Sequence, residues 1–176
     1  MKTKQIQVYE FKELKPKVRE IVIEKFRENN DYPFLHDLLT DRLQELLKKN
    51  KIKGEFKLLY SLSYCKGDGL CFTGRFDFKD FSFTINHNNN MYYHKHSTDI
   101  FVNEDFYEED ELKEIVQEKI RQEREEEFKG IYYKICDTLE KEGYDYIEEE
   151  NSEKNIKELI KINEYTFREN GEIENL

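Results

Sequence analysis

A glycine-rich loop in the first half of the chain holds the side chains best suited to chemistry. Residues 66–71 read KGDGLC, so Asp68 lies between Gly67 and Gly69, and a thiol, Cys71, follows. Glycines adopt positive φ angles at no steric cost, and an aspartate in such a turn commonly bonds to its own backbone. We therefore predict that Asp68 holds its own loop together. The alternative interpretation is that Asp68 binds a ligand.

Histidines and tyrosines form a second candidate group further along the chain. Tyr92, Tyr93 and His94 follow one another, with His87 and His96 close by. A metal site needs several converging ligands, and the sequence fixes no acid or cysteine beside these histidines. A surface patch of polar and aromatic residues is therefore favoured, and we predict neither a metal nor a cofactor. Aromatic residues are also enriched where proteins contact one another.

If the fold brings the two groups together, they would line one pocket at the end of a sheet. No sequence typical of a phosphate-binding loop, a metalloprotease or a serine hydrolase occurs, so an enzyme is the less favoured interpretation. The candidate contact site for a ligand or partner consists of Gly67, Asp68, Gly69, Tyr92, Tyr93 and His94.

The elements that must position these residues are three predicted strands within residues 56–87. Apolar and polar side chains alternate there, which is typical of strands with one buried face. We expect Phe78 to pair with Phe81 across a two-residue turn, and Tyr64 to pair with Phe72 across the glycine-rich loop. The apolar face would then be lined by Phe56, Leu58, Tyr60, Leu62, Tyr64, Phe72, Phe76, Phe78, Phe81, Phe83 and Ile85.

This register has consequences for two cysteines and one glycine. Cys65 and Cys71 would lie opposite each other, although a reducing compartment argues against a standing disulfide. Gly74 would lie in the middle of a strand on the apolar face, where a glycine usually allows another group to approach closely. We expect an aromatic side chain from a long helix at 108–142 to fill this notch.

Helical spacing of apolar residues predicts helices on both sides of the sheet. Before it we expect a short edge strand at 6–11, a helix that begins at Pro16 and a leucine-rich helix from Pro33. After it, residues 108–142 are interpreted as one long helix with a solvated stretch at 121–127. A break between two helices, or a lever that projects from the body, is the alternative.

The end of the chain completes the predicted fold. Gly143 is expected to end the long helix, Ser152 to cap a further helix, and residues 165–173 to form a closing hairpin. We predict an α+β fold, in which an antiparallel meander of four to five strands is packed on one face by N-terminal helices and by the long helix. It would form a single domain over 1–176, with a helical part (1–54), an antiparallel sheet (55–103) and a second helical part that ends in the hairpin (107–176).

The charge of the chain limits its partners. Its 176 residues include 39 acidic and 29 basic ones, which gives a net charge of −10. Direct binding to nucleic acid is not expected, because it needs clustered lysine and arginine. No apolar run reaches the roughly 20 residues of a membrane span and no signal peptide opens the chain, so we predict a cytoplasmic protein. The candidate acidic contact surface consists of Glu108, Glu109, Asp110, Glu111, Glu123, Glu125, Glu126, Glu127, Glu148, Glu149 and Glu150.

The spacing Gly67-Asp68-Gly69-x-Cys71 resembles the start of the ovarian-tumour family of cysteine deubiquitinases, in which the cysteine opens a helix. Here residues 72–78 alternate as a strand instead. Cys71 therefore lacks the helix N-terminus or neighbouring imidazole that activates such a thiol, and a cysteine nucleophile is not favoured.

A longer resemblance covers most of the chain. Residues 60–74, YSLSYCKGDGLCFTG, resemble the YSLSYCxGDGxxFxG segment of a family of small phage, prophage and plasmid proteins. Further blocks of that family are matched at 30–35, 92–94, 143–148 and 163–167. The resemblance implies an origin in a mobile element and residence in the bacterial host cytoplasm.

The resemblance and the charge together lead us to expect an inhibitor of a bacterial defence system, such as an anti-CRISPR. It would bind a basic surface of a defence protein or ribonucleoprotein and occlude a nucleic-acid channel. Two alternatives remain open: a small-ligand-binding protein or enzyme that uses the Gly-Asp-Gly loop, and a partner that neutralises a toxin.

Overall fold

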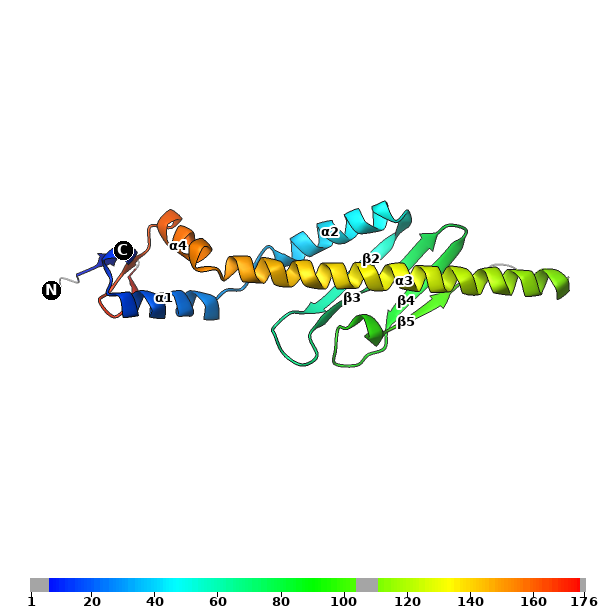
Figure 1. Cartoon of the computed structure of the whole chain (residues 1–176), viewed down its shortest axis with the longest axis horizontal. Coiled ribbons are helices and arrows are strands. Elements are labelled where there is room, and N and C mark those ends of the chain that lie inside the picture. Colours follow the sequence, from blue (N-terminus) through cyan, green and yellow to red (C-terminus); the bar gives the residue numbers. More distant parts are fainter. Residues whose placement is uncertain (1–6, 104–110, 175–176) are drawn as a thin grey trace, which may run out of the picture. The chain divides into compact units, whose positions relative to one another are not determined.

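The computed structural model describes residues 7–103 and 111–174 (Figure 1). The chain divides into two compact units, Phe34–Tyr144 and the combination of Met1–Pro33 with Asp145–Leu176. The helices are α1 (Pro16–Glu28), α2 (Leu35–Lys49), α3 (Glu111–Glu150) and α4 (Glu153–Ile162), with short 3-10 helices η1 (Phe11–Glu13) and η2 (Lys95–Ser97). The strands are β1 (Tyr9–Glu10), β2 (Ile52–Ser61), β3 (Gly69–Phe78), β4 (Phe81–His87), β5 (Thr98–Val102), β6 (Thr166–Phe167) and β7 (Ile173–Glu174).

The unit Phe34–Tyr144 is built on a four-stranded antiparallel sheet in the order β2-β3-β4-β5. The predicted α+β class and the predicted number of strands are confirmed. The β3–β4 hairpin has the predicted register, with Phe78 opposite Phe81 and Phe76 opposite Phe83. Residues 88–94 connect β4 to η2, which leads into β5.

The predicted register of β2 against β3 is wrong. Phe72 pairs with Leu58 rather than with Tyr64, because β2 ends at Ser61 and residues 62–68 form a wide loop. Leu58 and Tyr64 are six positions apart, so the shift leaves Phe56, Leu58 and Tyr60 on the predicted face. Tyr64 is in the loop and exposed, so its predicted place on the apolar face is wrong. Cys71 pairs with Leu59, and the predicted opposition of the two cysteines is therefore also wrong.

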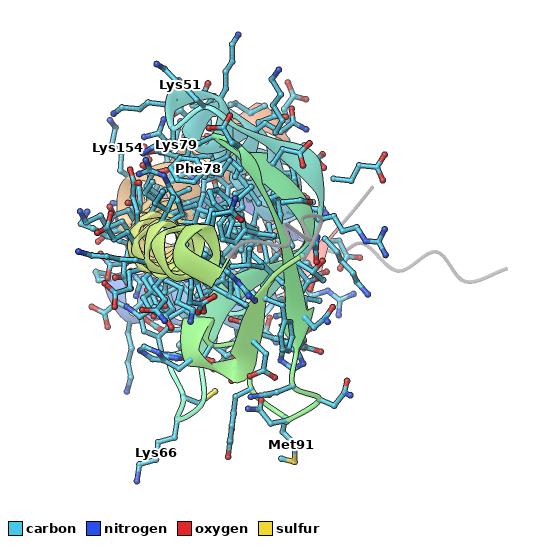
Figure 2. The ribbon with its side chains drawn as sticks, turned by 90° about the vertical axis from the view of Figure 1, so that its right-hand side faces the viewer. Lys51, Lys66, Phe78, Lys79, Met91 and Lys154 are labelled. Atoms are coloured by element: carbon cyan, nitrogen blue, oxygen red, sulfur yellow. The ribbon has the colours of Figure 1, made fainter. Side chains whose placement is uncertain are left out.

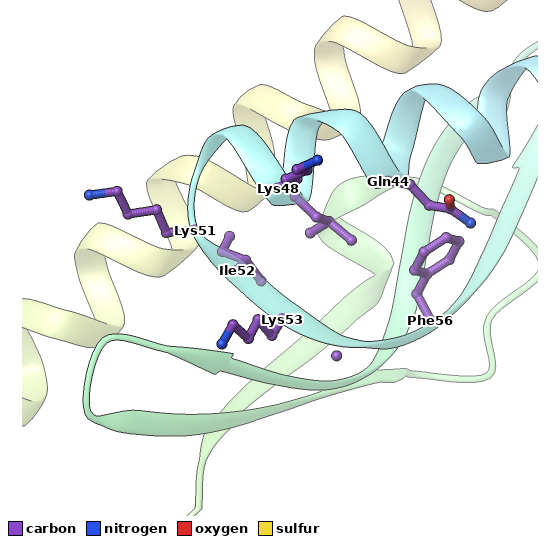
Figure 3. A pocket seen from close by; sticks show the side chains of 8 residues that line it. Gln44, Lys48, Lys51, Ile52, Lys53 and Phe56 are labelled. Atoms are coloured by element: carbon purple, nitrogen blue, oxygen red, sulfur yellow. The ribbon is translucent and has the colours of Figure 1, made fainter.

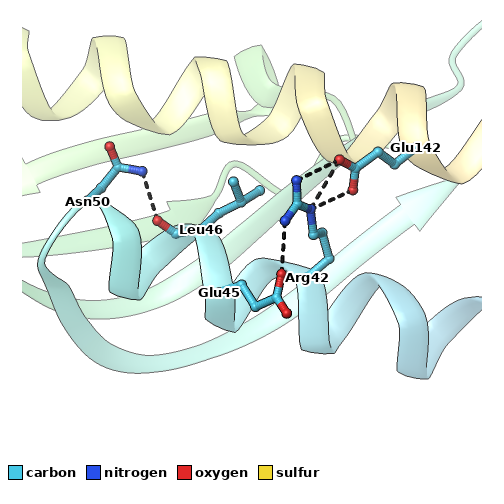
Figure 4. Close-up of polar contacts among 5 residues, drawn as sticks. All are labelled: Arg42, Glu45, Leu46, Asn50 and Glu142. Atoms are coloured by element: carbon cyan, nitrogen blue, oxygen red, sulfur yellow. Dashed lines mark hydrogen bonds and ion pairs between the residues drawn. The ribbon is translucent and has the colours of Figure 1, made fainter.

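Helix α3 crosses the apolar face of this sheet, as expected, and α2 lies beside it (Figure 1). The ring of Phe128 stacks on Phe83 with centroids 4.1 Å apart, and Tyr132 packs on Phe72 at 4.7 Å. Five leucines of α2 are buried as well, namely Leu35, Leu39, Leu43, Leu46 and Leu47. Arg42 joins the two helices through its Nε and one terminal nitrogen, which bond to both carboxylate oxygens of Glu142 (Figure 4).

Helix α3 is a single helix of 40 residues, which confirms the first of the predicted alternatives. Gly143 does not end it, contrary to the prediction. It is buried inside the helix, where an added Cβ would lie 2.5 Å from Cδ1 of Leu62. The glycine therefore serves close packing and not a change of backbone direction.

Gly74 does lie in the middle of β3, but no aromatic ring fills a notch beside it. Its φ is +145°, and an added Cβ would lie 2.0 Å from the carbonyl oxygen of Glu55 on β2. Gly54 on β2 shows the same relation to the carbonyl of Arg75. The glycines are required by the close approach of two backbones, so the predicted role of an α3 aromatic is wrong.

The second unit combines the two ends of the chain. Helix α1 begins at Pro16 and Ser152 caps α4, where its hydroxyl accepts a hydrogen bond from the Asn155 amide; both starts were predicted. Strands β6 and β7 form the predicted hairpin, and β1 pairs with β6 as an edge strand. The core of this unit consists of Leu14, Val22, Ile23, Ile156, Ile160 and Phe167.

Candidate functional site

The carboxylate of Asp68 is the centre of a hydrogen-bond network at one end of the four-stranded sheet. One oxygen accepts bonds from the backbone amides of Ser63 (2.6 Å) and Cys65 (3.1 Å) and from the hydroxyl of Tyr144 on α3 (2.8 Å). The other accepts from the hydroxyl of Ser61 at 3.1 Å and the thiol of Cys65 at 3.4 Å. The prediction that Asp68 bonds to its own loop is confirmed, and the bond to α3 is an addition.

These bonds decide the charge state of Asp68. Partial burial by itself would raise the pKa of the carboxyl group, but the donors from Tyr144, Cys65, Ser63 and Ser61 outweigh it, and the pKa is lowered from its ordinary value. Desolvation, and to a smaller extent the bond to Asp68, raise the pKa of Tyr144. The site therefore holds a stable carboxylate and a neutral phenol. Five donors occupy its oxygens, so the carboxylate acts as a tether between the loop and α3.

The structure brings together the residues of the candidate contact site. Gly67 has φ +101°, and an added Cβ would lie 2.3 Å from the ring of Tyr92. At Gly69, an added Cβ would lie 3.1 Å from Cα of His94. The loops that carry Lys66 and Met91 project on the same side, away from Lys51 (Figure 2). The two loops thus support each other, and the ring of Tyr92 covers the backbone at Gly67.

The histidines bond within their own loop. Nδ1 of His94 accepts from the amide of His96 at 3.2 Å, and Nε2 of His87 lies 3.0 Å from the carbonyl oxygen of Tyr92. His87, at the end of β4, pairs with Thr98 on β5 and not with β3, because the β3–β4 pairing ends at Gly74 and Ile85. In the described part of the chain, no three acidic, histidine or cysteine side chains are grouped so that they could hold a metal ion.

Sequence reasoning missed the contribution of α3 to this end of the sheet. The ring of Tyr144 packs on Tyr64 with centroids 4.8 Å apart, in addition to its bond to Asp68. Glu140, one turn earlier, has a raised pKa because it is partly buried, an effect that His94 offsets in part. The hydrogen-bond partner of Tyr144, Asp68, lies 76 positions earlier in the chain, so no local sequence pattern indicates this bond.

The thiols do not have the environment of a nucleophile. Cys71 is fully buried in β3, and desolvation raises its pKa to about 12. Cys136 on α3 is also buried, with a raised pKa of the same cause. Cys65 is exposed, but its hydrogen bond to Asp68 raises its pKa as well. The geometry agrees with the sequence prediction that Cys71 is not activated.

Within α3, the predicted acidic surface is partly neutralised. Glu127 accepts from Lys79 and from Arg124, and these bonds lower its pKa, while Glu125 forms an ion pair with Lys129. No described basic side chain forms an ion pair with Glu123 or Glu126, and both are exposed.

The side chains of the other predicted acidic residues lie outside the described part of the sheet-containing unit. Glu148, Glu149 and Glu150 belong to the second unit. Residues 108–110 and the side chain of Glu111 lie outside the described part of the chain. Of the predicted acidic surface, only the part within residues 117–127 of α3 is described and belongs to the sheet-containing unit.

None of the helices in the described ranges 7–103 and 111–174 combines the length and the apolar character that a membrane crossing requires. The chain was also compared with known proteins. Comparison with family models, with curated proteins and with solved structures finds no match.

Proposed function

We propose that this protein inhibits a bacterial defence system by binding, and that the acidic segment of α3, residues 117–127, contacts a basic surface of its target. One observation carries the proposal: residues 117–127 of α3 are exposed or half-exposed, and Phe128 is the first buried side chain that follows them. A helix segment that contributes little to the core of its own unit is available to a partner. The resemblance to phage and plasmid proteins supplies the expected class of target.

The charges of the segment support a basic partner. Glu123 and Glu126 are three residues apart, so they lie on the same face of the helix, and neither is engaged in an ion pair with a described residue. On a channel that normally holds nucleic acid, such carboxylates would occupy positions of phosphate groups. Association of this kind is accelerated by long-range attraction and weakens as salt is added.

The experiment compares two double variants of equal charge. Glu123→Gln/Glu126→Gln removes the unpaired carboxylates of the segment, and Glu148→Gln/Glu149→Gln removes two from the second unit. Binding to purified CRISPR effector complexes is measured at low and at physiological salt, together with their cleavage of target DNA. We expect the first variant to bind roughly tenfold more weakly and the second to bind within about twofold of the parent. Failure of the parent to bind any effector complex at low salt would contradict the proposal.

A ligand-binding function centred on Asp68 receives less support. Its oxygens are engaged by donors from Ser61, Ser63, Cys65 and Tyr144, so a ligand would have to displace existing bonds. The neighbouring loop places Tyr92 over Gly67 and fills space that a pocket would need. The loop end of the sheet is therefore better explained as a structural support than as a binding site.

A further inference from the structure

A groove lies between the end of α2 and the start of β2, in the sheet-containing unit (Figure 3). Its volume is about 420 Å³, and its apolar lining includes Leu47, Ile52 and Phe56. Lys48, Lys51 and Lys53 also line it. Leu47 and Ile52 are almost fully buried and belong to the core, Phe56 is half-buried, and the three lysines are exposed.

The lysines around this groove have no acidic partner in the described ranges. None of the ion pairs there involves Lys48, Lys51 or Lys53. Of the acids nearby, Glu45 is paired with Arg42, and Asp77 lies opposite Lys53 on β3 without an ion pair. Glu55, two residues after Lys53 on β2, is exposed, lies opposite Arg75 and does not line the groove. In a chain with a net charge of −10, three unpaired lysines around one groove are a local reversal of charge.

The end of α2 does not account for this arrangement. Positive side chains stabilise the C-terminus of a helix, which explains Lys48. However, the side chain of Asn50 already donates to the carbonyl oxygen of Leu46 (Figure 4), and so does its backbone amide. The amide of Lys51 donates to the carbonyl oxygen of Lys48. Lys53 is on the strand and outside the helix.

Beside the groove, β2 is an edge of its sheet. Its only strand partner among the described residues is β3, and none of the other backbone hydrogen bonds there involves residues 53–61. An edge of this kind can accept an additional strand, whose main chain supplies the bonds and whose alternate side chains supply specificity. A second copy paired antiparallel about Glu55 would set Lys53 against Lys57, so like charges oppose pairing of two identical edges.

We propose that this groove and the edge of β2 bind an extended acidic peptide segment of a partner protein. One of its apolar side chains would contact Leu47, Ile52 and Phe56, and its carboxylates would pair with the three lysines. Nucleic acid is a poorer occupant, because the remainder of the chain is strongly acidic and would repel a polyanion. This surface is separate from the acidic segment of α3 and has the opposite charge, so the inference does not depend on the proposed function.

The absence of tryptophan from the chain makes the test direct. The probe is the blocked peptide acetyl-Glu-Val-Glu-Trp-Glu-Val-Glu-amide, whose tryptophan fluorescence is followed as the full-length protein is added at low salt. We expect saturable binding, and amide shifts in a ¹⁵N spectrum that are concentrated in residues 51–57. Raising the salt concentration should weaken binding. Absence of binding, or shifts confined to other residues, would show that the lysines only protect the edge.

Matched variants and probes define the site. Lys48→Gln/Lys51→Gln/Lys53→Gln should weaken binding roughly tenfold, because each exposed ion pair contributes about two- to threefold. The control Lys66→Gln/Lys119→Gln/Lys134→Gln changes the net charge equally at three exposed lysines and should bind as the parent does. A probe with proline in place of both valines should not bind, since it cannot complete a strand. Equal binding of that probe, or displacement of the parent probe by oligothymidylate at equal charge, would overturn the assignment of an added acidic strand.

Discussion

Two glycines of α3 provide a matched test of how this helix packs. Gly130 is exposed, and an added Cβ would meet no atom within 4 Å. Gly143 is buried, and an added Cβ would lie 2.5 Å from Leu62 and 3.6 Å from Leu39. Both are helix-interior positions, at which alanine is favoured over glycine by about 0.8–1.0 kcal/mol. The intrinsic gain is therefore the same, and only the surroundings differ.

The expected effects follow from these distances. Gly130→Ala should stabilise the protein by about 1 kcal/mol, which corresponds to a rise of about 2–4 °C in Tm for a chain of this size. Gly143→Ala gains the same amount but forces Leu62 to move within a packed core, which costs about 1–3 kcal/mol. The net effect at Gly143 should be between zero and about 2 kcal/mol of destabilisation.

Thermal and urea unfolding of both variants measure these effects, and a double variant tests the cause. Leu62→Ala removes the atom that Gly143→Ala would strike, so the cost of the alanine should be smaller in that background than in the parent. If Gly143→Ala raises Tm as much as Gly130→Ala does, α3 does not pack against Leu62 and the reasoning is refuted.

Three further predictions concern the sheet and its loop. Asp68→Asn should lower the free energy of unfolding by about 1–2 kcal/mol at neutral pH. Because the pKa of Asp68 is lowered in the folded state, the parent loses this stabilisation as the pH falls below about 4, and the two proteins should then be equally stable. Urea unfolding at several pH values measures this difference. In the same variant, iodoacetamide should alkylate Cys65 faster near pH 8, because the hydrogen bond to Asp68 that raises the pKa of that thiol is lost. Cys71 and Cys136 are buried and should react only on unfolding. An unchanged rate at Cys65 would contradict the Cys65–Asp68 bond. Gly74→Ala should destabilise by more than about 2 kcal/mol in thermal unfolding, because its Cβ would meet the backbone of Glu55, and a stability equal to that of the parent would exclude this contact.

The parts of the fold that depend on local pattern could be predicted from the sequence. The Lys79-Asp80 turn joins two alternating runs with two residues, which leaves little freedom in the register, and the β3–β4 pairing was predicted correctly. The β2–β3 pairing was predicted wrongly, because the alternation of apolar and polar residues continues past Ser61 and does not show where β2 ends. The side chain of Asp68, which bonds to Ser61 and Ser63, decides that end.

The candidate site was predictable to the same extent. The loop role of Asp68 follows from its glycine neighbours, whereas its bond to Tyr144 joins residues 76 positions apart and has no local signal. Gly143 shows a related limit. A glycine near the end of an apolar periodic run indicates a helix end, and only the position of Leu62 reveals that it serves packing instead.

The division of the chain into units also determines the order in which they can fold during synthesis. The sheet-containing unit is one continuous stretch, Phe34–Tyr144, inserted between the two pieces of the other unit. Leu14, Val22 and Ile23 are synthesised before the sheet-containing unit, and their core partners on α4 and β6 are synthesised after it. Residues 34–144 can therefore fold while the segment before them still lacks its core partners and exposes its apolar side chains to solvent. During synthesis, that segment is prone to aggregation and to binding by chaperones.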